Sequence, residues 1–256
     1  MEKYAVVTGA SSGIGAEVAR ELARRGYSIV LVARRVERLE ELAATLPGKS
    51  VILAADLSEV GECERVMREV ADLPMEVFIN NAGFGDCGAF VETSLAKELS
   101  MIDVNVRAVH VFTKLAVQRF KEQGGGYVLN VASSAGLFPG GPYMATYYAT
   151  KAYVTSLTQA VACELSEDPT AGLVRVSCLC PGPVDTEFNQ VASVEFSLPG
   201  ITPEYCAHYA VDQLFRGKTV IVPTARMKAA VIAGRLVPRA VAVKIAGYQQ
   251  KKKLYR

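Results

Sequence analysis

Short, almost continuous apolar runs recur along this chain, and segments with helical spacing separate them. Strands that are buried on both faces of a sheet have this composition, because neither face meets water. The predicted strands lie at residues 4–8, 28–33, 50–55, 76–80, 127–133, 173–180 and 218–222.

Helices are predicted between these strands. The first carries Ile14, Val18 and Leu22 on one stripe. The others are expected at residues 36–45, 59–70, 94–122, 143–166 and 203–215. Regular alternation of strands and helices predicts an α/β fold, a single-domain Rossmann-type doubly wound parallel sheet with right-handed crossovers. Its ligand is expected at the carboxyl ends of the strands.

Composition excludes several other classes of protein. The 256 residues, half of them hydrophobic, are enough for one α/β domain. A run of about 18 apolar residues without charges is absent, so no membrane span is expected. The start, MEKYAVVTGA, lacks the layout of a secretory signal, so we expect a cytoplasmic location. The six cysteines form no CxxC and only two histidines occur, so we expect free thiols and no metal site.

The formal charge of +2 conceals a strong asymmetry between the ends of the chain. Residues 213–256 contain eleven Lys or Arg and no Asp or Glu, whereas the first 212 residues carry 17 basic and 26 acidic groups. We therefore expect a Rossmann-type domain over 1–224 and a basic, helical C-terminal extension of it over 225–256. Packing on the acidic body or on a partner subunit is the favoured interpretation.

Two other interpretations of the extension remain open. Its helices could lie on anionic lipid as a peripheral membrane contact, or could attract an anionic substrate. Nucleic acid is not expected as a partner, because no binding motif accompanies the charge.

A glycine-rich turn joins the first predicted strand to the first helix, with the sequence Thr8-Gly9-Ala10-Ser11-Ser12-Gly13-Ile14-Gly15. Glycines allow a sharp turn and a close approach to a pyrophosphate, which the helix N-terminus stabilises. The turn therefore predicts a dinucleotide site. Its expected cofactor-binding residues are Gly9, Ser11, Ser12, Gly13, Ile14 and Gly15.

The ends of the next strands carry further candidate cofactor residues. Arg34 and Arg35 follow the second strand, where NAD-binding sites place an acidic residue. An arginine can instead pair with a 2′-phosphate, so we expect NADP(H) rather than NAD(H). The expected contacts to adenine and ribose come from Asp56, Leu57, Asn81, Ala82 and Gly83.

Tyr147 and Lys151 are four residues apart on a predicted helix, so both side chains share one face. A free tyrosine has a pKa of about 10, which a neighbouring ammonium group lowers. Such a tyrosine can exchange a proton with an alcohol or carbonyl oxygen, while a serine hydroxyl orients that oxygen. Ser133 and Ser134 both end the preceding strand, and either can supply this hydroxyl.

Together these motifs resemble the short-chain dehydrogenase/reductase family over roughly residues 3–222. The matching segments are TGASSGIG (8–15), NNAG (80–83), the Asn of DVNV, YxxxK (147–151) and PG (181–182). The resemblance implies an oxidoreductase that transfers a hydride between a nicotinamide and a carbonyl or secondary alcohol. It also implies the catalytic set Asn105, Ser134, Tyr147 and Lys151.

The resemblance selects Ser134 because the family's serine stands thirteen residues before the tyrosine. It implies that Asn105 connects Lys151 to a proton relay and that Lys151 also binds the nicotinamide ribose, next to Tyr147. It places four residues around the nicotinamide: Pro181, Gly182, Val184 and Thr186. A homodimer or homotetramer is implied as well, although the extension departs from the family's usual C-terminus.

The substrate is less constrained. Residues 185–201 form a lid in the family, and here they bring Phe188, Val191, Val194 and Phe196. Phe84, Phe138, Tyr143 and Met144 lie close to the motifs, so an apolar ketone or alcohol is expected. A hydroxysteroid dehydrogenase and a 3-oxoacyl reductase remain alternatives. The alternative of another class is a non-catalytic nucleotide-sensing Rossmann protein, which would not need the proton-transfer residues.

Overall fold

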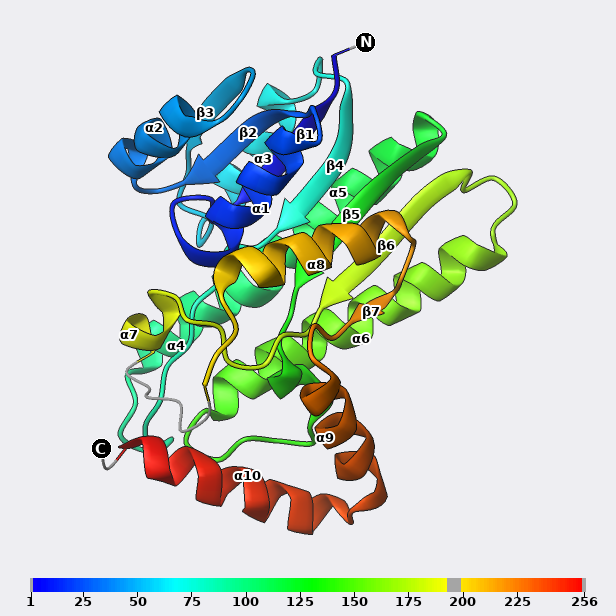
Figure 1. The fold of residues 1–256 in the computed structure, drawn as a ribbon. Coiled ribbons are helices and arrows are strands. Elements are labelled where there is room, and N and C mark those ends of the chain that lie inside the picture. Colours follow the sequence, from blue (N-terminus) through cyan, green and yellow to red (C-terminus); the bar gives the residue numbers. More distant parts are fainter. Residues whose placement is uncertain (1, 193–198, 255–256) are drawn as a thin grey trace.

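A seven-stranded parallel sheet is the centre of the computed structural model, which describes residues 2–192 and 199–254 (Figure 1). The strand order is β3-β2-β1-β4-β5-β6-β7, so the winding direction reverses between β1 and β4. Ligands of doubly wound sheets bind at this reversal. The strands are β1 (Tyr4–Thr8), β2 (Ser28–Ala33), β3 (Ser50–Ala54), β4 (Met75–Asn80), β5 (Gly125–Val131), β6 (Leu173–Leu179) and β7 (Val220–Ile221).

Helices cover both faces of the sheet and bury its apolar side chains. The first face packs against α1 (Gly13–Arg24), α2 (Val36–Thr45) and α8 (Pro203–Phe215). The second packs against α3 (Val60–Glu69), α5 (Val109–Glu122) and α6 (Ala145–Glu167). Two covered faces explain the unbroken apolar strands, and the predicted Rossmann-type fold is confirmed.

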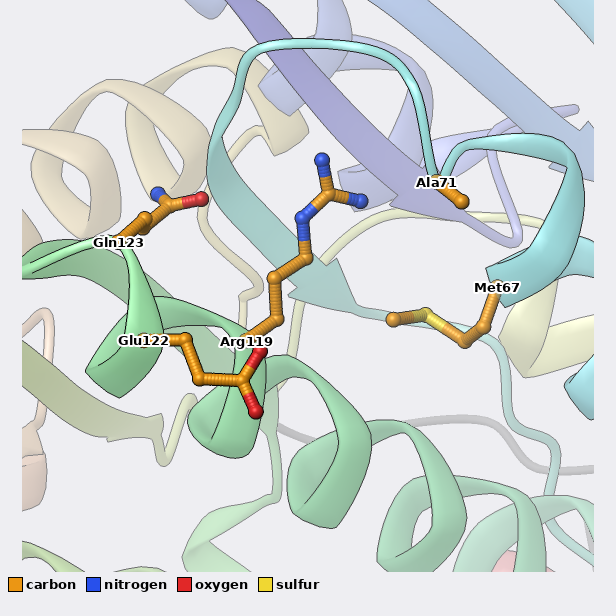
Figure 2. Close-up of a pocket in the computed structure, with 5 residues that line it drawn as sticks. All are labelled: Met67, Ala71, Arg119, Glu122 and Gln123. Carbon is orange, nitrogen blue, oxygen red and sulfur yellow. The ribbon is translucent and has the colours of Figure 1, made fainter.

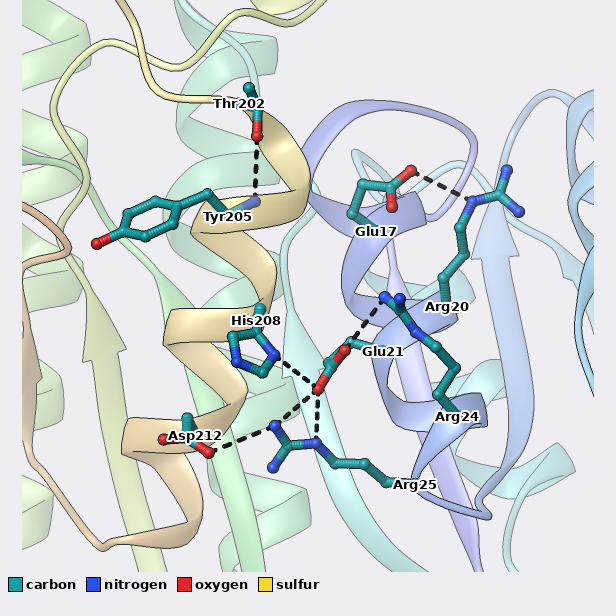
Figure 3. A network of polar contacts seen from close by, with 9 residues as sticks. All are labelled: Glu17, Arg20, Glu21, Arg24, Arg25, Thr202, Tyr205, His208 and Asp212. Carbon is teal, nitrogen blue, oxygen red and sulfur yellow. Dashed lines mark hydrogen bonds and ion pairs between the residues drawn. The ribbon is translucent and has the colours of Figure 1, made fainter.

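A polar network connects α1 with α8 and so steadies the helix that begins at the glycine-rich turn (Figure 3). Glu21 on α1, largely buried, pairs with Arg24 at 3.1 Å and with Arg25 at 2.7 Å. His208 on α8 lies 3.1 Å from the same carboxylate, and Arg25 reaches Asp212 on α8 at 3.5 Å. Side chains from both helices thus converge on one carboxylate at their contact.

The segment 94–122 was predicted as one helix, and the structure corrects this. It contains α4 (Leu95–Ile102), a π-helical segment η1 (Asp103–Ala108), and then α5. A π-turn adds a residue to the helical turn and is often found at functional sites. Here the turn contains Asn105, whose side chain is fully buried and hydrogen-bonds outside the helix.

The predicted helical extension is confirmed as α9 (Ala225–Leu236) and α10 (Arg239–Leu254), which run beside the segment between β5 and α6 (Figure 1). Glycines allow both helices to approach this segment closely. A Cβ at Gly234 would lie 2.9 Å from the Phe138 ring, and one at Gly247 would lie 3.0 Å from Pro142. A domain boundary at residue 224 stays a prediction.

Within the described parts of the chain, none of the helices combines the length and apolar character needed to cross a membrane.

Candidate active site

The glycine-rich turn is closely packed against the end of β4. Gly9 and Gly13 have φ values of +64° and +56°, which disfavour residues with a side chain. A Cβ at Gly15 would lie 2.3 Å from Asn81 Nδ2 and 2.4 Å from the carbonyl oxygen of Gly9. The turn is therefore packed too tightly for side chains at these positions, and this glycine-lined cradle suits a bound pyrophosphate.

Asn81 fixes this cradle from the neighbouring strand. Its Nδ2 donates to the carbonyl oxygens of Thr8 and Gly9 at 3.0 and 3.1 Å. The Thr8 hydroxyl accepts from the backbone N–H groups of Asn81 and Ala82 at 3.0 and 3.1 Å. The ends of β1 and β4 are thereby joined, and the predicted residues of both motifs lie together.

The two arginines after β2 point to different partners. Arg35 Nη2 donates to the hydroxyls of Ser11 and Ser12 at 3.2 and 3.1 Å, and to Glu187 at 3.0 Å. Arg38, one turn further along α2, also reaches Glu187, at 3.2 Å. The structure thus brings Arg35 to the predicted serines and adds two residues that the sequence analysis missed, Arg38 and Glu187.

Arg34 does not join the Arg35 cluster; its charge instead acts on Asp56, just after the end of β3. The Asp56 carboxylate accepts hydrogen bonds from the backbone N–H and hydroxyl of Ser58, at 3.0 and 2.8 Å. These bonds, chiefly the one from the backbone, and the charge of Arg34 hold the pKa of Asp56 below its usual value. Asp56 therefore shapes the turn after β3, next to the buried Leu57, and a contact with adenine stays a proposal.

Tyr147 and Lys151 share one buried face of α6, as the spacing predicted. Their residues are 8% and 4% exposed. Lys151 Nζ donates to the carbonyl oxygen of Val131, the last residue of β5, at 2.8 Å. The same nitrogen lies 5.9 Å from the centre of the Tyr147 ring.

Burial changes the ionisation of both groups. It raises the pKa of Tyr147 to about 12, and a hydrogen bond with the Ser133 side chain acts in the opposite direction. It lowers the pKa of Lys151 to about 8, because the ammonium group has lost its water. Near neutral pH the phenol is therefore protonated and poised as a proton donor.

The serine side chain that acts on Tyr147 is that of Ser133, the residue before the selected Ser134. The Ser133 side chain hydrogen-bonds Tyr147 and also accepts from the backbone N–H of Ala135 at 3.1 Å. Ser134 donates its backbone N–H to the carbonyl oxygen of Pro181 at 2.8 Å. A count of thirteen residues crosses the loop before α6, and loop length is not fixed by regular hydrogen bonding. One extra loop residue is enough to move the position to the preceding serine.

Asn105 holds the segment that runs past the lysine. Its side chain accepts from the backbone N–H of Phe84 at 3.1 Å and donates to the Phe84 carbonyl oxygen at 2.8 Å. It also donates to the hydroxyl of Thr150 on α6, at 3.2 Å. A Cβ at Gly83 would lie 2.8 Å from Asn105 Oδ1 and 3.3 Å from Lys151 Nζ. Only a glycine fits between them, so the NNAG motif and α6 meet here.

The segment after β6 closes over the cradle. A Cβ at Gly13 would lie 3.1 Å from the methyl group of Thr186, and Val184 pairs with Ile201 in a short parallel bridge. A Cβ at Gly182 would meet Met227 of α9 at 2.7 Å. The predicted nicotinamide-lining residues therefore lie between the glycine-rich turn and the extension.

Apolar side chains surround Tyr147. The Phe188 ring is centred 5.4 Å from the Tyr147 ring, and Met144, Tyr148 and Phe84 belong to the same cluster. The predicted Val194 and Phe196 lie outside the described residues, as does the side chain of Val191.

Two features of this region were not expected from the sequence. Tyr143 has a φ of +67°, a strained conformation for a residue with a side chain. Gln250 on α10 is buried and donates from Nε2 to the Tyr148 hydroxyl at 2.7 Å. The extension therefore forms part of the wall around the tyrosines.

A surface hollow between α3 and α5 lies by the start of β4, far from these groups (Figure 2). Arg119 occupies it and donates to the carbonyl oxygens of Val70, at 2.8 Å, and of Leu73. Gln123 donates to the carbonyl oxygen of Met75 at 2.8 Å. These side chains satisfy the ends of neighbouring elements, so the hollow is structural.

Comparison with known proteins gives matches over most of the chain. The sequence pattern of the short chain dehydrogenase family matches residues 3–195. An uncharacterised oxidoreductase of Staphylococcus epidermidis is 33% identical over 191 residues, which are 74% of this chain and 81% of that protein. A short-chain dehydrogenase from Sphingobium yanoikuyae, solved in complex with NADPH, is 32% identical, with a TM-score of 0.81 over 91% of this chain and 94% of its own.

A second solved structure resembles this chain in fold alone. It is a short-chain dehydrogenase/reductase from Burkholderia phymatum in complex with NAD, 24% identical, with a TM-score of 0.81 over 90% of this chain and 92% of its own. Relatives of this fold therefore include proteins bound to either nicotinamide cofactor.

The depressed pKa of Lys151 makes a prediction for stability. Above its ordinary pKa of 10.5 the lysine is neutral in both states, whereas below about pH 8 the folded state carries the full cost of burying the charge. Lys151→Met should therefore raise the free energy of unfolding at pH 7 by about 1–3 kcal/mol, after the lost hydrogen bond to Val131 is counted. This gain should shrink as the pH rises from 8 to 10.5.

Denaturant unfolding across this pH range would measure the effect. Lys114→Met, on the exposed face of α5, is the matched control and should change stability little at any pH. A Lys151→Met protein that is less stable than the parent at pH 7 would contradict the prediction.

Proposed function

We propose that this chain, which belongs to the short-chain dehydrogenase/reductase family, transfers a hydride between NADP(H) and a carbonyl or secondary alcohol, with Tyr147 as general acid and base. The family makes it an oxidoreductase acting between CH–OH and C=O groups. One observation carries the finer proposal: a buried, protonated tyrosine that is hydrogen-bonded to a serine and lies beside a desolvated lysine.

In the reduction direction, the substrate oxygen would lie between the hydroxyls of Tyr147 and Ser133. Tyr147 donates its proton to the forming alkoxide, and Ser133 stabilises the charge that develops there. Lys151 stabilises the resulting phenolate by its charge. Asn105, through its bonds to Phe84 and Thr150, positions the backbone that would relay the replacement proton. When bound, the nicotinamide would supply or accept the hydride.

The cofactor proposal rests on the donors that surround the glycine-rich turn. Arg35 and Arg38 converge with the hydroxyls of Ser11 and Ser12, a set that suits the three oxygens of a 2′-phosphate. The described end of β2 offers Arg34 and Arg35 and no carboxylate for a ribose hydroxyl. These observations support NADP(H) over NAD(H). The same proposal keeps Asp56 and Leu57 near adenine, Asn81, Ala82 and Gly83 near ribose, and residues 181–186 near nicotinamide.

The apolar cluster around Tyr147 supports an apolar carbonyl or alcohol substrate, with a hydroxysteroid or a 3-oxoacyl compound as specific alternatives. A homodimer or homotetramer is the proposed assembly, by analogy with the family. A non-catalytic nucleotide sensor is disfavoured, because such a protein has no need of a buried lysine beside a buried tyrosine.

Tyr147→Phe tests the reaction. The variant should lose at least a thousandfold in kcat, since the general acid is gone, while Kd for NADPH changes little. A screen of ketones, hydroxysteroids and acyl thioesters, followed by NADPH absorbance, would give the rates. The adjacent Tyr148→Phe is the control and should keep most of the activity. Substantial turnover by Tyr147→Phe would refute the assigned role.

The two serines can be separated directly. Ser133→Ala should lower kcat by roughly 10²–10³, because the hydroxyl that shares the oxygen's charge is removed. Ser134→Ala should stay within a few-fold of the parent enzyme, because that residue contributes its backbone N–H to Pro181. Steady-state kinetics at saturating cofactor would measure both. The reverse order of effects would restore Ser134 to the catalytic set.

The arginines can be compared in the same way. Arg35→Ala should weaken NADPH binding by about 10- to 100-fold and NADH binding by less than threefold, because only NADPH carries the 2′-phosphate. Arg34→Ala, whose guanidinium acts on Asp56, should have a smaller effect on the ratio. Titration of cofactor fluorescence would give the constants. Equal losses for both cofactors in Arg35→Ala would contradict the NADP(H) assignment.

A further inference from the structure

Glu187 lies where an anion is expected to bind. One carboxylate oxygen is 3.0 Å from Arg35 Nη2 and the other is 3.2 Å from Arg38 Nη1. The pKa of Glu187 is held below its usual value, chiefly by the hydrogen bond from Arg35, so the group is ionised at neutral pH. A hydrogen bond with the Ser12 side chain contributes in the same direction.

These contacts join distant parts of the chain. Arg35 and Arg38 follow β2, whereas Glu187 belongs to the segment after β6, 152 residues from Arg35. The carboxylate therefore ties the segment over the nicotinamide end of the cradle to the arginines at its adenosine end.

From these contacts we infer that Glu187 is a built-in competitor of the cofactor's 2′-phosphate, and that binding of NADP(H) releases the segment that carries it. The inference rests on the proposed NADP(H) function. Glu187 thus determines cofactor specificity without contributing a favourable contact to the cofactor.

Charge explains why the carboxylate can be displaced. Two guanidinium groups face one carboxylate, which leaves one positive charge unbalanced. A phosphate monoester carries about −1.5 to −2 charges at neutral pH and three acceptor oxygens, so it matches this set better. The three side chains are 36–49% exposed, which makes each existing ion pair weak. NADH, which has no 2′-phosphate, has no means of removing the carboxylate.

Release of Glu187 would change the surroundings of Tyr147, the proposed proton donor. Glu187 is flanked by Thr186, whose methyl group faces Gly13, and by Phe188, whose ring lies 5.4 Å from the ring of Tyr147. The backbone N–H of Phe188 donates to the Thr186 hydroxyl at 3.3 Å, so the three residues form one compact turn. Freeing Glu187 therefore frees the side chain that covers Tyr147, and cofactor binding would prepare the substrate side.

Glu187→Gln tests the inference, because it keeps the size of the side chain and removes its charge. A ligand that must displace an internal competitor binds more weakly by the fraction of sites that the competitor occupies. The variant should therefore bind NADPH about three- to tenfold more tightly, while Kd for NADH stays within twofold. Adenosine 2′,5′-bisphosphate and 5′-AMP, titrated by calorimetry, should show the same contrast and need no turnover.

Glu37→Gln is the matched control. Glu37 lies beside Arg38 on α2, is exposed, and forms no ion pair with the described residues. The Glu37→Gln substitution removes a charge of the same sign close to Arg38 but breaks no ion pair among the described residues. It should therefore leave the ratio of the NADPH and NADH dissociation constants within twofold of the parent. If the Kd for NADPH shifted equally in both variants, the overall negative charge near the arginines, and not the ion pair of Glu187, would control binding. That result would overturn the inference.

Unchanged or weaker NADPH binding by Glu187→Gln would also overturn it and would make Glu187 a strap that supports the closed segment. The two proposals fail separately. Turnover by Tyr147→Phe would refute the function and leave the binding contrast intact, whereas an unchanged ratio in Glu187→Gln would leave hydride transfer untouched.

Discussion

Burial of the Lys151 ammonium group is the constraint around which the active site is built. The charge has lost its water and donates to the last carbonyl of β5, which fixes the height of α6 along the sheet. Neighbouring segments can approach Lys151 closely on two sides because glycines stand at the points of contact. A Cβ at Gly83 would press on the ammonium nitrogen, and one at Gly136 would lie 2.3 Å from the Lys151 carbonyl oxygen. In the proposed reaction, the lysine costs stability so that the tyrosine beside it can be held ready to donate a proton.

The sequence was a good guide wherever the determining interactions are local. Most strands are buried on two faces, as their apolar runs predicted, although the edge strand β3 is only partly buried. The bounds of α2 and α8 agree with the prediction because their apolar periodicity is regular. Tyr147 and Lys151 share a face because a helix fixes the direction of residues four apart. The glycine-rich turn was identifiable because its backbone conformation restricts which residues can be used there.

Prediction was wrong or incomplete where contacts cross long stretches of chain. The π-turn at Asn105 depends on hydrogen bonds to Phe84 and Thr150, which periodicity does not encode. Ser133 is proposed in place of Ser134 because a residue count across a loop is not a geometric constraint. Glu187 gave no signal of its own, since its partners precede it by about 150 residues.

The C-terminal extension packs on the body of the chain, as the sequence favoured, but its charges do not make the contacts around Tyr148. Gly234 and Gly247 face Phe138 and Pro142 in the segment before α6. The amide of Gln250 donates to the Tyr148 hydroxyl on α6. Small residues allow the backbone of each helix to approach closely, and dispersion forces then hold them. The ammonium group of Lys228 lies over the ring of Tyr209 and donates a hydrogen bond to its hydroxyl. The extension therefore packs beside Tyr148 and the segment before α6, and any role for its surface cations is additional to that packing.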